Sequence, residues 1–223
     1  MASVLVTGSS GFLGGAIIPK LIALGHRVIG LDPLPLRDAQ YRTVADDLLD
    51  RTRLERLLIE EQVSHIIHAG GISGPMVMPE RPDHLMAVNV GGSSTLLQAA
   101  IGAKASTFLY CSSVSAVGPY YEERPIGADY RPAPTDPYGC SKAAVDFVLQ
   151  GLWRRIPLDL CTLRFTGIYG PGRRTTNVID TLITAALESR SVQLPRQGEY
   201  PMFISMMQPT PLLRRVFLND DAT

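Results

Sequence analysis

Tyr138 and Lys142 are the residues whose types and spacing point most directly to chemistry. They stand four positions apart in Tyr138-Gly139-Cys140-Ser141-Lys142, and a helix places residues four apart on one face. A phenol with its ordinary pKa near ~10 is a poor base at neutral pH. A cation within about 4–6 Å favours the phenolate and lowers that pKa, so the pair could move a proton on or off an alcohol. The alternative is a solvated pair on a helix surface.

The bulk properties of the chain are those of an ordinary globular protein. It has 223 residues, of which 45% are hydrophobic and 19% charged, with zero net charge and a pI of about 6.9. One sizeable core is therefore expected. The charge balance indicates no nucleic-acid or membrane partner. No basic leader precedes the first apolar run, and no run reaches the ~18 residues of a membrane helix, so we expect a cytoplasmic protein.

The three cysteines, Cys111, Cys140 and Cys161, are an odd number without metal-ligand spacing. Reduced, mostly buried thiols and no metal site are expected, which fits a cytosolic compartment. Cys140 lies inside the Tyr–Lys motif, where a thiol has no role in the chemistry. We expect it to be a small packing residue.

Short β-branched runs alternate with helical stretches along the chain. We expect strands at 4–6, 27–31, 41–45, 65–68, 107–111 and 158–163, and helices at 12–24, 50–61, 83–100 and from 137. Nearly continuous apolar strands indicate burial on both faces of a sheet. The order predicts an α/β fold, a Rossmann-like doubly wound parallel sheet. Asp136 is the expected N-cap and Pro137 the first residue of the helix that carries Tyr138.

A glycine-rich segment joins the first expected strand to the first helix. Glycines permit a tight turn and close backbone approach, and the helix N-terminus presents amides to a pyrophosphate. Such a triplet is often only a turn, but its place between a strand and a helix favours a dinucleotide site. The residues expected to line this site are Gly8, Gly11, Phe12, Leu13 and Gly14.

Asp32 ends the second expected strand, about twenty residues beyond the glycines. A carboxylate there would bind the adenosine ribose hydroxyls and would repel the 2′-phosphate of NADP. The nearest following arginine is Arg37, so NAD is favoured over NADP. The alternative is a surface turn residue before Pro33.

Together these residues resemble the extended short-chain dehydrogenase/reductase family, the NAD-dependent epimerase/dehydratase group. The resemblance runs from residue 2 to about residue 200, with the motifs in the family's order. Besides the glycine loop and the Tyr–Lys pair they are Asp47-Leu48, His68-Ala69-Gly70, Asn89-Val90-Gly91-Gly92, Cys111-Ser112-Ser113 with Val117-Gly118, and Arg164 with Tyr169-Gly170-Pro171-Gly172.

The resemblance implies that the chain binds NAD. Asp47 and Leu48 would contact the adenine, and Ala69 and Gly70 would lie along the cofactor. Asn89 would support the active site. Tyr138 and Lys142 would contact the cofactor as well as act in catalysis. No chemistry is assigned to His68, which could be a satisfied core histidine.

The resemblance also implies a mechanism. Tyr138 would take the proton of a substrate hydroxyl while the nicotinamide accepts the hydride. Lys142 would lower the pKa of the tyrosine and hold the nicotinamide ribose. Ser113 would donate a hydrogen bond to the developing carbonyl oxygen, although Ser112 could fill the same strand-end position. A dehydrogenase releases the oxidised product, whereas an epimerase rotates and re-reduces it.

Departures from the family pattern bear on the substrate. Val114-Ser115 follow the catalytic serine position where the 4,6-dehydratase branch has adjacent Asp and Glu, so dehydration is not expected. Gly167 stands where sugar-nucleotide epimerases usually carry an asparagine. The stretch 68–73 reads somewhat like uronate-dehydrogenase relatives. We expect a sugar-like small molecule, either a sugar nucleotide or a sugar acid, and the resemblance implies a homodimer.

The chain departs from the family pattern near Met202. We expect an NAD-binding Rossmann domain with the catalytic residues over 1–165, and a partial substrate-binding region over 166–223. Codons that encode 202–211 can spell Val-His-Ile-Asp-Asp-Ala-Ala in a neighbouring frame, which is the motif the family has there. We hypothesise a slipped reading frame, with a genuine divergent tail as the alternative. An NAD-binding protein without turnover is the rival to an enzyme.

Overall fold

The computed structural model describes residues 1–74, 78, 80–119, 126–127, 130–173, 175, 178–192 and, for the backbone alone, 203–205. The chain divides into two compact units, Met1–Arg164 and Phe165–Thr223. Every residue named above for the cofactor and for catalysis belongs to the first unit.

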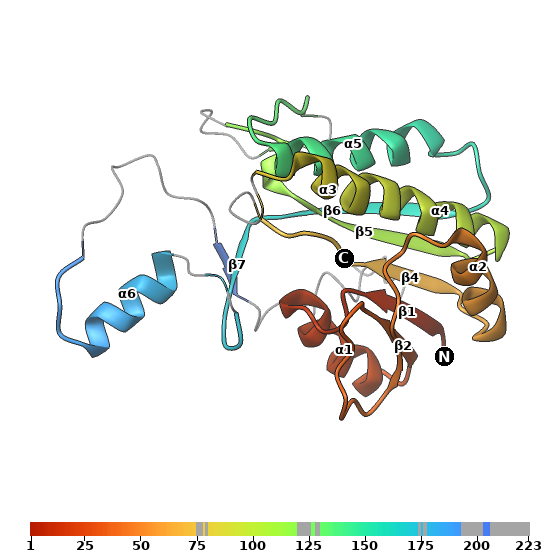
Figure 1. The fold of residues 1–223 in the computed structure, drawn as a ribbon, viewed down its shortest axis with the longest axis horizontal. Helices are drawn as coiled ribbons and strands as arrows, with labels where there is room; N and C mark the ends of the chain where they lie inside the picture. The colour runs from red at the N-terminus through yellow and green to blue at the C-terminus, as the bar shows by residue number, and fades with distance from the viewer. Residues whose placement is uncertain are drawn as a thin grey trace, which may run out of the picture. The chain divides into compact units, whose positions relative to one another are not determined.

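The first unit is built on a six-stranded parallel sheet in the order β3-β2-β1-β4-β5-β6 (Figure 1). In this sheet Val4 pairs with Val28 on one side and with His65 on the other. The strand order reverses between β1 and β4, and in such sheets ligands bind at the carboxyl ends of the strands at that point. The strands are β1 (Ser3–Thr7), β2 (Arg27–Leu31), β3 (Arg42–Val44), β4 (His65–His68), β5 (Thr107–Ser113) and β6 (Asp159–Phe165).

Helices cover both faces of the sheet, which confirms the doubly wound fold (Figure 1). On one face, α2 (Arg51–Glu60), α4 (Ser93–Gly102) and α5 (Pro137–Leu152) share one apolar core with alternate strand residues. Leu5, Ile66 and Phe108 point into this core and are fully buried. On the other face, α1 (Phe12–Ala23) packs on β1 and β2. Side chains that alternate along a strand supply both cores.

The expected helix over 83–100 is interrupted by a π-helical segment. It consists of α3 (Pro82–Met86), a π-helix at Ala87–Gly92 and then α4. The apolar pattern predicted one continuous helix because one wider turn leaves little trace in a 3.6-residue period. Asn89 lies in this wider turn, and π-helical turns often occur at functional sites.

The start of α5 follows the sequence prediction. The Asp136 carboxylate accepts a hydrogen bond of 2.9 Å from the Gly139 amide, and Pro137 occupies the first turn. This cap satisfies one of the free amides at the helix start. Asp136 therefore determines where the helix begins, and with it the position of Tyr138.

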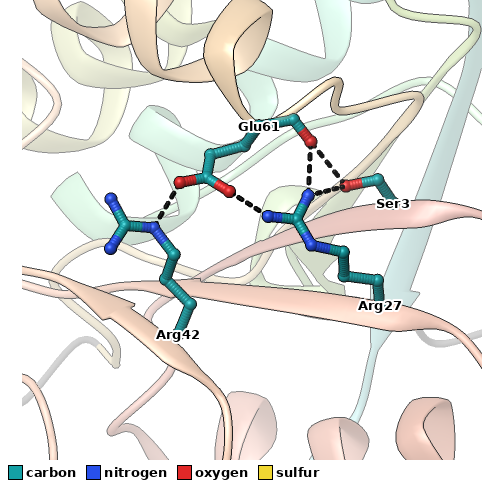
Figure 2. Close-up of polar contacts among 4 residues, drawn as sticks. All are labelled: Ser3, Arg27, Arg42 and Glu61. Atoms are coloured by element: carbon teal, nitrogen blue, oxygen red, sulfur yellow. Dashed lines mark hydrogen bonds and ion pairs between the residues drawn. The ribbon is translucent and has the colours of Figure 1, made fainter.

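A polar cluster joins the amino-terminal ends of β1, β2 and β3 at the edge opposite the glycine loop (Figure 2). The Glu61 carboxylate pairs with both Arg27 and Arg42. Its backbone carbonyl accepts hydrogen bonds from Arg27 at 2.7 Å and from the Ser3 hydroxyl at 2.9 Å. Partial burial opposes the ionisation of Glu61, but the two arginines outweigh it and lower the pKa of this carboxyl. The cluster stabilises the sheet away from any site.

The second unit contains β7 (Gly167–Tyr169), α6 (Val178–Leu187) and β8 (Phe203–Ser205). β7 and β8 pair in parallel, with Gly167 opposite Phe203. The part of the hypothesised out-of-frame tail that follows Ser205 lies outside the described residues. Within the part of the chain that the structure describes, no helix combines the length and the apolar character needed to cross a bilayer.

Candidate active site

The glycine loop between β1 and α1 forms a tight cradle of backbone. Gly8 has φ +66°, a left-handed conformation that favours glycine. A β-carbon on Gly8 would lie 2.7 Å from the Ala69 carbonyl oxygen, and one on Gly14 would lie 2.2 Å from the Gly8 carbonyl oxygen. Gly11 caps α1, and its amide donates to Gly8 at 3.0 Å. Larger residues would fill this cradle, so it fits a pyrophosphate held on backbone amides.

Asp32 lies beside this loop, as the ribose-binding prediction requires. Its Oδ2 accepts a hydrogen bond of 3.2 Å from the Ser10 amide, and its Oδ1 accepts one of 2.9 Å from the Leu34 amide. Phe12 and Leu13, also predicted for the cofactor site, form the first turn of α1 and are partly buried.

Asp47 and Leu48 follow β3 at the same edge of the sheet. Asp47 is exposed and accepts a hydrogen bond of 3.1 Å from the Leu49 amide. The Leu48 side chain is buried in the core and lies against Gly92, and its backbone has φ +72°. At this position the Asp47 side chain is exposed and the Leu48 side chain is not, and their contact with an adenine stays a prediction.

Asn89 holds the loop after β4 against α5. Its Oδ1 accepts from the Ile72 amide at 2.8 Å, and its Nδ2 donates to the Ile72 carbonyl at 3.0 Å. Nδ2 also donates to the Ser141 hydroxyl at 3.0 Å. Asn89 thus links the loop after β4 to α5, and its support of an active site stays a prediction. Ala69 and Gly70, at the start of the same loop, lie against Gly8.

Ser113, rather than Ser112, contacts the Tyr138 phenol. The Ser113 hydroxyl hydrogen-bonds to the phenol, whereas the Ser112 hydroxyl is buried beside the Asp146 carboxyl, where it favours the ionised form of that carboxyl. Successive side chains on a strand point to opposite faces, so only one of two neighbouring serines can face the phenol. Spacing in the sequence allowed either serine at the phenol. Their placement on β5 puts Ser113 there, and a catalytic role for Ser113 stays a prediction.

Ser73 is a site residue that the sequence reasoning missed. Its hydroxyl also hydrogen-bonds to the Tyr138 phenol. Ser73 follows Ile72, the residue bracketed by Asn89, so the π-helical segment places this second hydroxyl at the phenol. The available signal was a serine just beyond a strand that ends at the same sheet edge as β5. That signal is weak without the contacts of Asn89.

Lys142 shares the buried face of α5 with Tyr138, as their spacing predicted. Its ammonium donates to the Cys111 carbonyl at 3.0 Å and lies 4.8 Å from the Tyr110 ring centre. The distance to the Tyr138 ring centre is 5.8 Å. Burial lowers the pKa of Lys142 to about 8, against the smaller opposing effects of Cys111 and Asp146.

The pKa of Tyr138 differs from the expectation. Burial has the largest effect and raises it, while the hydrogen bonds from Ser113 and Ser73 act in the opposite direction. The expected lowering by Lys142 is not found: the pKa of Lys142 is about 8, below that of Tyr138, so the lysine loses its proton before the phenol ionises. In this structure, the groups that favour the phenolate are the two serine hydroxyls.

The expectation for Cys140 is wrong. All three cysteines are free thiols, but Cys140 is exposed while Cys111 is buried. The buried stripe of α5 includes Gly139 and Ser141 on either side of Cys140, whose position faces away from the sheet. Among the described residues, no group of His, Cys, Asp and Glu side chains could hold a metal ion.

Comparison with known proteins identifies a family whose model matches most of the chain. The model of the NAD dependent epimerase/dehydratase family matches residues 4–201. The chain belongs to this family. The match covers the glycine cradle, the loop after β4 and the Tyr138 helix, and it confirms the resemblance to extended short-chain dehydrogenases.

Relatives of known activity are similar to the chain over most of its length. A UDP-glucose 4-epimerase of Neisseria meningitidis serogroup A is 26% identical, and the match covers 90% of this chain and 66% of the relative. A dTDP-D-glucose 4,6-dehydratase of Mus musculus is 26% identical, with 87% and 58% covered. The chain thus spans about three fifths of the length of these relatives. The solved UDP-glucose 4-epimerase of Thermus thermophilus in complex with NAD is 25% identical, with TM-score 0.82, and the match covers 95% of this chain and 74% of that one.

Proposed function

We propose that this chain is an NAD-dependent oxidoreductase or epimerase that acts on a hydroxyl of a sugar-like substrate through Ser113, Tyr138 and Lys142. The observation that carries this proposal is the buried Tyr138 phenol with the Ser113 and Ser73 hydroxyls hydrogen-bonded to it. This group lies at the carboxyl edge of the strands, where the glycine loop also lies.

The cofactor site of this proposal is built from the glycine cradle and Asp32. Gly8, Gly11 and Gly14 leave room for a pyrophosphate at the start of α1, and the Asp32 carboxylate beside them would bind ribose hydroxyls. Bound NAD would supply the hydride acceptor. The solved relative that contains NAD supports this choice of cofactor.

Tyr138 would move the proton. In the oxidation direction its phenolate takes the proton of the substrate hydroxyl, and in the reduction direction the phenol returns it. Because burial raises the pKa of Tyr138, the two serine hydroxyls are needed to stabilise the phenolate. The Lys142 ammonium, at 5.8 Å from the ring centre, adds positive charge on the buried side of the helix.

The substrate class in this proposal is a sugar nucleotide or a sugar acid. The relatives' names specify UDP-glucose and dTDP-glucose, which supports the sugar nucleotide. The glycine at position 167 and the stretch 68–73 favour the smaller sugar acid. A homodimer in the cytoplasm completes the proposal, and light scattering of the purified protein tests the dimer.

The test is incubation of the purified chain with NAD and a panel of UDP-sugars, dTDP-sugars and uronic acids. NADH absorbance reports a dehydrogenase, and chromatography of the sugars reports an epimerase, which forms no net NADH. We expect product with the natural chain and a loss of at least ~10³-fold in Tyr138→Phe, with NAD affinity retained. NAD binding without product from any sugar would favour the NAD-binding protein without turnover.

A further inference from the structure

Five buried polar residues form one hydrogen-bonded network between the glycine loop and the helix of Tyr138, in which the link from Ser93 to Asn89 passes through the Asn89 backbone carbonyl. They are Thr7, His68, Ser93, Asn89 and Ser141, and none is more than 3% exposed. Thr7 accepts from the Gly70 amide at 3.0 Å and lies 2.7 Å from His68 Nδ1. His68 Nε2 lies 2.7 Å from the Ser93 hydroxyl.

The hydrogen-bonded network continues from Ser93 to α5. The Ser93 hydroxyl donates to the backbone carbonyl of Asn89. The Asn89 side chain donates to the Ser141 hydroxyl at 3.0 Å, and that hydroxyl donates to the Tyr138 carbonyl at 2.7 Å. One end of this hydrogen-bonded network thus lies at Gly70, which packs against Gly8. The other end lies in the first turn of α5.

The Asn89 backbone carbonyl fixes the direction of each hydrogen bond from Ser93 back to Thr7. A carbonyl oxygen has no proton, so the single proton of Ser93 must point to Asn89. Ser93 can then only accept from His68, which places a hydrogen on Nε2. Nδ1 carries a lone pair and must accept from the Thr7 hydroxyl, whose oxygen accepts from the Gly70 amide.

The surroundings of His68 favour this neutral form. Burial, and to a lesser extent the charge of Lys142, lowers the pKa of His68 to about 3. The neighbouring rings of Phe108 and Tyr110 have their centres 6.0 Å and 5.5 Å away and carry no charge. Each nitrogen therefore keeps one role: Nδ1 accepts and Nε2 donates.

We propose that His68 is a positioning residue that, in one fixed tautomer, holds the glycine loop through Nδ1 and the Tyr138 helix through Nε2. The proposal rests on the proposed function for its catalytic consequence, but the placement of the two segments does not depend on turnover. A packing residue would act on both segments equally. The two nitrogens of His68 act on different segments.

Two substitutions of His68 remove its two hydrogen bonds one at a time. The amide of asparagine reaches the place of Nδ1, so His68→Asn keeps an acceptor for Thr7 and loses the donor to Ser93. The amide of glutamine reaches the place of Nε2, so His68→Gln keeps the donor and loses the acceptor. His68→Phe keeps the ring volume and loses both. Thermal unfolding of each variant identifies any that fails to fold.

The first measurement is ¹⁵N NMR of the histidine ring in the natural protein, assigned by the loss of its signals in His68→Gln. We expect a neutral ring with hydrogen on Nε2 from pH 5 to pH 8. Hydrogen on Nδ1, or a charged ring in this range, would overturn the proposal whether or not the protein has activity.

The second measurement compares amide hydrogen exchange and NAD affinity. In His68→Gln we expect exchange about tenfold faster in 8–14 and NAD affinity about tenfold weaker, with the first turn of α5 unchanged. In His68→Asn we expect faster exchange at 138–142, NAD affinity within about threefold, and any turnover about tenfold lower. His68→Phe should show both effects. If His68→Asn and His68→Gln changed exchange equally in 8–14 and in 138–142, His68 would be a packing residue and the proposal would be wrong.

Discussion

Gly139 and Ser115 are in direct backbone contact: a β-carbon on Gly139 would lie 2.3 Å from the Ser115 carbonyl oxygen. The first turn of α5 therefore rests on the 3₁₀ turn Val114–Ala116 that follows β5. This contact brings Tyr138, the residue before Gly139, to the Ser113 hydroxyl. The glycine in the Tyr–Lys motif thus determines how closely the phenol approaches the strand.

Gly139→Ala should separate these two segments. We expect a loss of about 1–3 kcal/mol in stability from overpacking, and a loss of about 10²-fold in kcat/KM because a displacement of about 1 Å has that effect. Gly151→Ala in the same helix is the control, since nothing lies within 4 Å of its β-carbon position. The control should be neutral or stabilising by up to ~1 kcal/mol. Equal behaviour of the two variants would contradict the role of the contact.

Ser73→Ala should shift the pH dependence of oxidation toward alkaline pH. The Ser73 hydroxyl lowers the pKa of Tyr138, so its removal raises that pKa further and leaves less phenolate at neutral pH. We expect a rate about tenfold lower at pH 7, recovered in part at high pH. Ser73→Thr keeps a hydroxyl and should retain the natural profile. An unchanged profile in the alanine variant would remove Ser73 from the site.

Lys142→Met should abolish turnover and at the same time stabilise the fold. The folded pKa of about 8 lies below the ordinary lysine value of 10.5, so burial of the ammonium costs stability at neutral pH. Loss of the hydrogen bond to the Cys111 carbonyl offsets part of this gain, and we expect a net gain of about 1–2 kcal/mol at pH 7.

The pH dependence checks the cause of that gain. The unfolded chain keeps the Lys142 proton between pH 8 and pH 10.5 while the folded protein releases it, so the natural protein becomes more stable as pH rises through this window. Denaturant titrations should therefore show the advantage of Lys142→Met shrinking above pH 8. Exposed Lys104 provides the control, and Lys104→Met should show no such trend.

Glu61→Gln should weaken the sheet without affecting the site. The pKa of the folded carboxyl lies below its ordinary 4.5, so its contribution is fully present above that pH and is lost as pH falls through the folded pKa. We expect a loss of about 1 kcal/mol at pH 7, since both arginines are half exposed. Urea unfolding should show the difference vanishing at low pH. Glu60→Gln, an exposed neighbour, should be neutral.

The coding DNA tests the hypothesis of a slipped frame near Met202. The family match ends at residue 201, beside the proposed slip. We expect the codons for 202–211 to read Val-His-Ile-Asp-Asp-Ala-Ala in the neighbouring frame. Codons incompatible with that frame would leave a divergent tail as the explanation.

Local signals in the sequence were sufficient for the framework of the site. The glycines near the N-terminus predicted the turn because the left-handed backbone at Gly8 favours glycine and no β-carbon fits at the close approach of Gly14. Asp136 and Pro137 predicted the start of α5 because cap chemistry depends on neighbours along the chain. The alternation of apolar strands and helices predicted the doubly wound sheet because that pattern can also be read from neighbouring residues along the sequence.

Tertiary structure alone decided the chemistry around the phenol. The choice of Ser113 over Ser112, the arrival of Ser73 through Asn89, and the direction of the Lys142 ammonium depend on contacts between segments far apart in the chain. The raised pKa of Tyr138 has the same origin, because desolvation depends on all the atoms that surround a group. The spacing of tyrosine and lysine predicted which residues meet on the helix. The packed surroundings determined the pKa of each residue, raising that of Tyr138 and lowering that of Lys142.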